Sequence, residues 1–429
     1  MKPLKIAINA QISPDKGAGG VDQVLIGLVS ALGKLEGPEE YVIITPWYDP
    51  DWISPYIGSN QVIISMAKIY KKLYLKIGKR ISEPARPLRN KLLHFMAQIK
   101  ENNSFHIPVS DGFYEKLGAD VIHFPYQSFV QTSLPSIFNP HDLQHLHYPQ
   151  YFTPSEIKWR EFIYRAGCNR SGIVAVASQW VKQDIRNNYH IDPNKIQVIP
   201  WAAPTQAFDS PSTKMISELE SKYELNKPFA FYPAMTWPHK NHLRLLEAIA
   251  DLRDNANLRI NLVCTGDKSS DFFPKIEERI AQLSLDEQVK FLGIIPHSEL
   301  RAIYELSQFV IVPTLFEAAS GPVFEAWYEG IPVACSTVTS LPEQVGDAAL
   351  LFNPNSTEAI ARSLERMATE QELRNDLKRK GTKRLQDFSW ERTAKAYRAA
   401  YRLAAGRPLS EEDVKLLNWD WMQNPNEET

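Results

Sequence analysis

Two glutamates, Glu317 and Glu325, lie eight residues apart and flank a segment that contains Ser320, Gly321 and Pro322. Because proline fits the first turn of a helix, we expect a helix to begin here, with Glu317 in the loop before it. The N–H groups and the dipole at such a helix start favour phosphate. Two carboxylates beside a phosphate suit a sugar nucleotide, since one can bind the ribose hydroxyls and the other the sugar. The alternative is an ordinary capped helix with Glu325 on its solvated face.

Buried-type strands alternate with helical segments, which indicates parallel α/β sheets. A first series has apolar runs at 6–10, 41–45, 119–124, 172–178 and 195–200. A second series has runs at 228–234, 258–266, 288–293, 309–314, 332–337 and 348–353. Apolar periodicity weakens between the two series, so we expect two doubly wound domains. Ligands of such sheets bind beyond the carboxyl ends of the strands, so a substrate should lie between the domains.

Composition sets the broad class of the protein. The chain has 429 residues, 44% hydrophobic and 23% charged, with a formal net charge of −2. A balanced charge argues against a globally basic nucleic-acid binder. Cys168, Cys264 and Cys335 are widely separated, so we interpret them as buried small side chains in a reducing compartment. We expect a cytoplasmic protein, or one peripheral to the inner face of a membrane, because no signal sequence or spanning segment is evident.

Several motifs in the second half of the chain resemble those of retaining glycosyltransferase family 4. The pair Glu317 and Glu325 follows a strand that ends in Pro-Thr and precedes Gly-Ile-Pro-Val-Ala. Further segments similar to that family are YPAMTWPHKNHLRLLEAI, VCTGD, SLPEQVGDAALLFNPNSTEAIARSLERM and FSWERTAKAYRAAY. The resemblance implies the GT-B fold, in which two Rossmann-like domains face each other across a cleft. It also implies transfer of a hexosyl group from a UDP- or GDP-linked donor to a glycan or lipid-linked acceptor, with retention of configuration.

The resemblance assigns roles to individual residues. It places Glu317 on the donor sugar, Glu325 on the ribose and Lys240 on the diphosphate. A cation aimed at the diphosphate makes physical sense, because the leaving group gains charge in the transition state. The remaining donor-binding residues that it implies are Ser320, Gly321 and Pro322.

The sequence departs from the family pattern at two positions. Met235 stands where the family usually has an arginine for the diphosphate, and His239 and Arg244 are candidate substitutes. Ser320 stands where the family usually has glycine, which puts the geometry of the loop in question.

The first half of the chain is less specific. Gly19 and Gly20 lie in a glycine-rich turn, where the family places the donor phosphate and the acceptor, although tight-turn geometry alone would explain them. His141 and Asp142 match the family's His-Asp element, with the histidine near the transferred sugar, and Tyr126 should face the cleft. The i, i+4 spacing of His141 and His145, with His147 close by, could suggest a metal site. Pro140 and Pro149 argue against a regular helix there and no third ligand is evident, so we expect neither metal nor cofactor. Ser178 fits a helix N-cap.

We expect three regions. They are an N-terminal acceptor-binding domain (1–204), a nucleotide-sugar domain (205–395), and a C-terminal helix and tail (396–429) that packs back on the first domain. An insert at 66–105 in the first domain is basic: residues 66–100 hold ten Lys or Arg and one acid, Glu83. Such a segment could contact an anionic membrane or cover the acceptor cleft as a solvated helix pair or loop.

Two other functions fit the same motifs. A GT-B sugar-nucleotide epimerase would turn over the donor without an acceptor. A non-catalytic sugar-nucleotide-binding protein would bind the nucleotide diphosphate and release none. A GT-B phosphorylase is less favoured, because we find no pyridoxal-phosphate lysine site.

Overall fold

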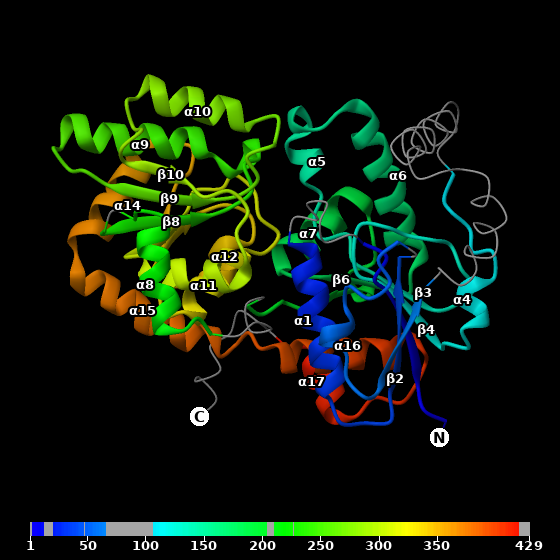
Figure 1. Ribbon diagram of the computed structural model, residues 1–429. Helices are drawn as coiled ribbons and strands as arrows, with labels where there is room; N and C mark the ends of the chain where they lie inside the picture. Colours follow the sequence, from blue (N-terminus) through cyan, green and yellow to red (C-terminus); the bar gives the residue numbers. More distant parts are fainter. Residues whose placement is uncertain are drawn as a thin grey trace, which may run out of the picture.

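The computed structural model describes residues 2–12, 20–46, 48–65, 106–203, 210–225 and 227–419. The basic insert, Gly19 and the predicted boundary at 204–205 lie outside these residues. The described part contains two parallel sheets, each flanked by helices, in two lobes that lie side by side (Figure 1). No helix in this part is long and apolar enough to cross a membrane.

The first lobe is built on seven parallel strands in the order β3-β2-β1-β4-β5-β6-β7. The strands are β1 Lys5–Asn9, β2 Glu40–Thr45, β3 Gln61–Ser65, β4 Val121–Phe124, β5 Ser136–Phe138, β6 Ile173–Val176 and β7 Ile196–Val198. The helices are α1 Val21–Lys34, α4 Phe113–Lys116, α5 Gln144–His147, α6 Pro154–Arg170 and α7 Gln179–Tyr189, with short 3₁₀ turns η2 Ser54–Tyr56, η4 Pro149–Tyr151 and η5 Pro193–Lys195. Ser178 caps α7, as predicted, because its side chain accepts the N–H of Val181.

The second lobe is built on six strands in the order β10-β9-β8-β11-β12-β13. The strands are β8 Phe229–Pro233, β9 Asn261–Thr265, β10 Val289–Phe291, β11 Phe309–Val312, β12 Val333–Ser336 and β13 Leu350–Phe352. Its helices are α8 Thr213–Lys222, α9 His242–Asn255, α10 Phe273–Gln282, α11 His297–Leu306, α12 Gly321–Tyr328, α13 Leu341–Val345, α14 Thr357–Thr369 and α15 Gln371–Leu385, with the turn η7 Pro238–Lys240. All three cysteines are free and buried.

The last two helices, α16 (Trp390–Ala404) and α17 (Glu411–Leu417), return to the first lobe and lie beneath its sheet (Figure 1). Trp390 packs on α1 at Gly27, where any Cβ would lie 2.2 Å from the indole. The indole Nε1 donates to the Ala203 carbonyl at 2.9 Å. Glycine is therefore required at this point of α1 for α16 to dock.

A buried hydrogen-bond network joins α16 to β4 and the end of β5. His123 contacts the Tyr401 hydroxyl through Nδ1 at 2.8 Å and the Asn139 Oδ1 through Nε2 at 2.9 Å. Asn139 Nδ2 in turn donates to the Tyr397 hydroxyl at 2.7 Å. Burial lowers the pKa of His123 to about 4, so its ring is neutral. An amide oxygen only accepts, so Nε2 carries the proton and Nδ1 accepts from Tyr401.

Candidate functional site

Lys240 and Glu317 meet at the edge of the second sheet. Lys240 ends the turn after β8, and Glu317 lies in the loop after β11, as predicted. Because β8 and β11 are neighbouring parallel strands, their carboxyl ends bring the two residues together. Lys240 Nζ lies 2.6 Å from Glu317 Oε1, with 16% and 12% of the two side chains exposed. Both side chains are thus largely buried but keep some contact with solvent.

The loop that carries Glu317 is held by hydrogen bonds to α13 and to the two residues before α13. The Glu317 carbonyl accepts hydrogen bonds from Thr339 Oγ1 at 2.6 Å and Ser340 Oγ at 2.7 Å. Gln344 binds both backbone groups of Ser320, since Oε1 accepts its N–H at 2.8 Å and Nε2 donates to its carbonyl at 3.0 Å. The backbone of the loop is therefore held at both ends of the segment between Glu317 and α12.

Ser320 occupies a conformation that does not require glycine. It precedes α12 with φ −100° and ψ 107°, which any residue can adopt. Its side chain does not cap the helix, and its buried Oγ has no hydrogen-bond partner among the residues that the structure describes. The helix begins at Gly321, with Pro322 in its first turn as predicted. The departure from the family pattern at Ser320 thus leaves a regular helix start next to Glu317.

Glu325 is buried inside the second domain rather than placed on a solvated face. The Tyr304 hydroxyl donates to its Oε2 at 2.6 Å. Burial raises the pKa of Glu325 to about 7; the hydrogen bond from Tyr304 acts against this rise, and the charge of Glu329 adds to it. The carboxyl group therefore changes its protonation state near neutral pH.

His141 lies in the first domain, after β5, in a left-handed conformation with φ 65°. Its Nε2 lies 2.9 Å from the Pro125 carbonyl, and its ring packs edge-on against Trp201 with centroids 5.5 Å apart. Burial lowers the pKa of His141 against the opposing charge of Asp142, so the ring is neutral. Since a carbonyl only accepts, Nε2 carries the proton and Nδ1 is an acceptor.

The other residues predicted in the first domain have separate surroundings. Asp142 Oδ1 accepts the N–H of Gln144 at 2.9 Å. Tyr126 is partly buried, and burial raises the pKa of its hydroxyl. Gly20 precedes α1 with φ 90°, which glycine adopts readily. Among the described residues, no hydrogen bond joins this group to the pair Lys240 and Glu317.

The three clustered histidines have different partners. His145 Nε2 lies 2.9 Å from Glu161, and His147 Nε2 lies 2.8 Å from Asp184. Within the described ranges, no group of three or more His, Cys, Asp or Glu side chains is arranged to hold a metal ion. The expectation of a metal-free site stays a prediction.

The two candidates for the arginine missing at Met235 also lie near the pair. His239 is buried and its ring packs on Trp237 at 5.7 Å. Arg244 donates to the Asn241 side chain and to the Pro354 carbonyl, both at 3.2 Å. Both side chains are thus held by the second domain, and their role towards a phosphate stays a prediction.

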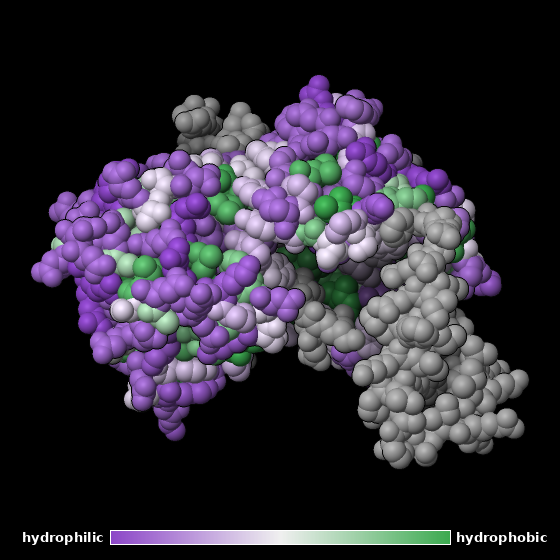
Figure 2. Space-filling view, turned by 90° about the horizontal axis from the view of Figure 1, so that it is seen from above, coloured by the Kyte–Doolittle hydropathy of each residue, from purple (hydrophilic) through white to green (hydrophobic). Residues whose placement is uncertain are grey.

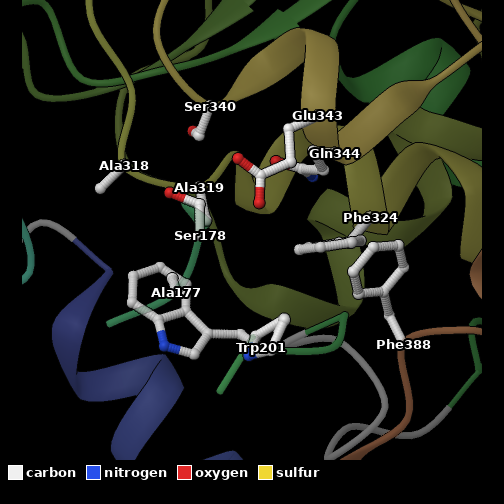
Figure 3. A pocket seen from close by; sticks show the side chains of 11 residues that line it. Ala177, Ser178, Trp201, Ala318, Ala319, Phe324, Ser340, Glu343, Gln344 and Phe388 are labelled. Atoms are coloured by element: carbon white, nitrogen blue, oxygen red, sulfur yellow. The ribbon is translucent and has the colours of Figure 1, made fainter. Parts of the chain in front are cut away.

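Contacts across the two domains were not predicted from the sequence. Tyr148 donates to the Leu315 carbonyl at 3.1 Å, and Gln23 Nε2 lies 3.1 Å from His297 Nε2. Glu343 accepts the backbone N–H groups of Gln179 and Trp180. A small pocket lies here, lined by Ala177, Ser178, Pro200, Trp201, Ala318, Ala319, Phe324, Ser340, Glu343, Gln344 and Phe388 (Figure 3). Seen from above, the surface is hollowed between the domains, with hydrophobic residues on its floor (Figure 2).

The fold and the motifs agree with two family matches, one for each domain. Residues 18–206 match Glycosyltransferase Family 4, and residues 216–384 match Glycosyl transferases group 1. The chain belongs to glycosyltransferase family 4, and it is a glycosyltransferase with the GT-B fold.

The chain is similar to several proteins that are named as glycosyltransferases. The O-antigen chain mannosyltransferase B of Escherichia coli is 25% identical over 266 residues, which are 61% of this chain and 69% of that protein. The D-inositol 3-phosphate glycosyltransferase of Corynebacterium glutamicum (strain R) is 27% identical over 307 residues, 67% of this chain and 73% of that protein. The structure of Anabaena Alr3699/HepE in complex with UDP and glucose superposes with a TM-score of 0.64 at 15% identity, covering 94% of this chain and all of that one.

Proposed function

We propose that the protein transfers a hexosyl group from a UDP- or GDP-linked donor to a hydroxyl of a glycan or lipid-linked acceptor, with retention of configuration. The observation that carries this proposal is the pair of Lys240 Nζ and Glu317 Oε1, 2.6 Å apart beside the start of α12. The pair offers a cation for the diphosphate and a carboxylate for the sugar hydroxyls. The N-terminal turn of α12 adds partial positive charge at the same place.

Each residue has a defined part in the proposed reaction. Lys240 and the start of α12 stabilise the negative charge that develops on the departing diphosphate. Glu317 accepts hydrogen bonds from the sugar hydroxyls and thereby fixes the anomeric carbon near the acceptor. Glu325 accepts hydrogen bonds from the ribose when it is ionised, and the Nδ1 of His141 can accept one from the transferred sugar.

Retention is proposed to follow from attack on the face that the diphosphate leaves. In the donor complex Glu317 is proposed to accept hydrogen bonds from the sugar hydroxyls, and this engagement disfavours its attack on the anomeric carbon and hence a covalent glycosyl intermediate. In the proposed mechanism the acceptor hydroxyl forms the new bond to the anomeric carbon as the bond to the diphosphate oxygen breaks. The departing phosphate takes the hydroxyl proton.

The first test is release of the nucleoside diphosphate (NDP) from a panel of UDP-, GDP- and ADP-sugars. GDP-mannose and UDP-glucose come first, because one relative is a mannosyltransferase and one structural neighbour holds UDP and glucose. We expect slow hydrolysis of one donor, lost in Glu317→Ala and accelerated by glycan or lipid-linked acceptors. Binding without release from any donor, with or without these acceptors, would instead support the non-catalytic alternative.

Two further measurements separate the remaining alternatives. An epimerase would change the sugar of the donor without an acceptor, which NMR of the recovered sugar nucleotide detects. NMR of the anomeric proton in the first minutes of product formation decides between retention and inversion. Flotation of the protein with anionic vesicles, compared with a variant neutralised in 66–100, tests the proposed membrane contact of that segment.

A further inference from the structure

The N-terminus of α7 in the first domain is capped by a carboxylate from the second domain. Glu343 Oε1 accepts the N–H of Gln179 at 2.6 Å, and its Oε2 accepts the N–H of Trp180 at 3.0 Å. The carboxylate points across the pocket towards Ser178 (Figure 3). A negative charge at a helix start with two short hydrogen bonds is a favourable contact, and it exists only while the domains are together.

The residue before Glu317 is embedded in the same part of the first domain. Phe316 is 2% exposed, and its ring lies 5.5 Å from His147, 6.1 Å from Tyr148 and 5.6 Å from Trp180. Trp180 thus contacts the second domain twice, through its ring and through its backbone N–H.

The two contacts are linked within the second domain. Gln344, the neighbour of Glu343 in α13, holds the backbone of Ser320, and Ser340 holds the carbonyl of Glu317. Arg384 in α15 fixes α13 in turn by donating to the carbonyls of Glu343 and Gln344, both at 3.1 Å. Consecutive hydrogen bonds therefore connect the N-terminus of α7, through α13, to the loop that carries Glu317.

We propose that Glu343 is a positioning residue, a latch that holds the two domains closed and thereby fixes Glu317 in its working position. This inference rests on the proposed role of Glu317 at the donor sugar. When the domains separate, Glu343 and the α7 amides return to water, and Phe316 loses its three aromatic neighbours. The loop of Glu317 then keeps only its contacts within the second domain.

The test compares three variants in the full-length protein. Glu343→Ala removes the latch, and Glu343→Gln keeps its shape and one acceptor while removing the charge. Glu156→Ala is the matched control, because Glu156 caps a helix start within the first domain, at Thr153. Dyes at Lys116→Cys and Glu287→Cys, both exposed, report the distance between the domains by energy transfer. The native cysteines are buried and should not be labelled.

We expect Glu343→Ala to lengthen the interdomain distance and to lower kcat/KM for NDP release about ten- to a hundred-fold, the range for a lost charged hydrogen bond. Glu343→Gln should have a smaller effect on the interdomain distance and on kcat/KM. Glu156→Ala should change neither of these two quantities, although it should lower the melting temperature slightly. A wild-type distance in Glu343→Ala, or a longer distance with unchanged kcat/KM, would overturn the proposal. Failure of the proposed function is distinct: the wild type would release no NDP from any donor, and the distance alone would then decide on the latch.

Discussion

Lys240 Nζ and Glu317 Oε1 lie 2.6 Å apart, so the cation and the anion of the candidate donor site neutralise each other in the absence of a ligand. A bound sugar nucleotide carries both partners they need: negative phosphates for the lysine and hydroxyl donors for the glutamate. Binding therefore exchanges one internal ion pair for two external contacts, and neither charge has to be left without a partner.

Lys240 and Glu317 should behave as a unit in mutagenesis. We expect Lys240→Met and Glu317→Gln each to lower kcat/KM for NDP release by about a hundred-fold, because Lys240 stabilises the charge that develops on the diphosphate and Glu317 positions the sugar. The double variant should lose less kcat/KM than the product of the two single fold-losses, because removing either partner already disrupts the pair. Lys222→Met is the matched control, since Lys222 forms a 2.9 Å ion pair with Glu299 on the surface of the same domain. Strictly multiplicative losses would contradict this coupling.

The pKa of Glu325 near 7 predicts a pH-dependent affinity for the nucleotide. The ionised carboxylate is the better acceptor for ribose hydroxyls, so affinity should rise as the pH increases from 6 to 8. Calorimetric titration of the nucleotide diphosphate measures this rise. In Glu325→Gln the pH-dependent rise in affinity should vanish. In Tyr304→Phe the midpoint of this rise should move to higher pH, because the hydrogen bond from Tyr304 lowers the pKa of Glu325. An unchanged pH profile in Glu325→Gln would rule out this residue as the origin.

The raised pKa of Glu325 should make the stability of the protein fall with pH, whereas the affinity for the nucleotide should rise. Its pKa in the folded protein is raised from 4.5 to about 7, so the folded state binds more protons than the unfolded state between these values. The free energy of unfolding should therefore fall as the pH rises through this window. Urea unfolding at pH 5, 6 and 7.5 measures the decrease, and Glu325→Gln should flatten it.

Removal of the Tyr401 hydroxyl should destabilise the first domain. Tyr401→Phe leaves the buried Nδ1 of His123 without its donor, which costs about 1–3 kcal/mol. Urea unfolding measures the loss, and Tyr328→Phe, at an exposed phenol, serves as the control. Equal stability of the two variants would contradict the hydrogen bond assigned here.

Activity should not depend on a divalent metal. We expect EDTA to leave NDP release unchanged, because Lys240 and the start of α12 supply the positive charge for the leaving group. Addition of Mg²⁺ or Mn²⁺ after EDTA is the matched measurement. Loss of activity that a metal restores would show that the diphosphate needs a further cation, a role for which the position of Met235 is the first place to look.

Long apolar runs made most of the two sheets predictable. The strands at 41–45, 119–124 and 309–314 were expected and confirmed, and so was the helix start at Pro322. Two strands were missed. β5 has only three residues, Ser136–Phe138, between prolines, and β3 has only three apolar residues in a row. Runs this short carry no periodicity, and it is their pairing with neighbouring strands that makes them strands.

The candidate site was predictable only where its residues are close in sequence. Glu317, Pro322 and Glu325 share one motif, so their placement in a loop and on a helix followed from local rules. The bond of Glu343 to Gln179 joins residues 164 positions apart, and the pKa of Glu325 depends on burial beneath Tyr304. Neither relationship leaves a local pattern, because both arise from packing between distant elements.

The docking of α16 on α1 has a consequence for the order in which the molecule can be completed. Trp390, Tyr397 and Tyr401 belong to the hydrophobic core beneath the first sheet. A ribosome that has made the whole first half of the chain has not yet supplied these side chains. The core of the first domain therefore stays partly exposed until the second domain and α16 have been synthesised. Shortened chains that end before residue 390 should consequently aggregate, even when both sheets are present.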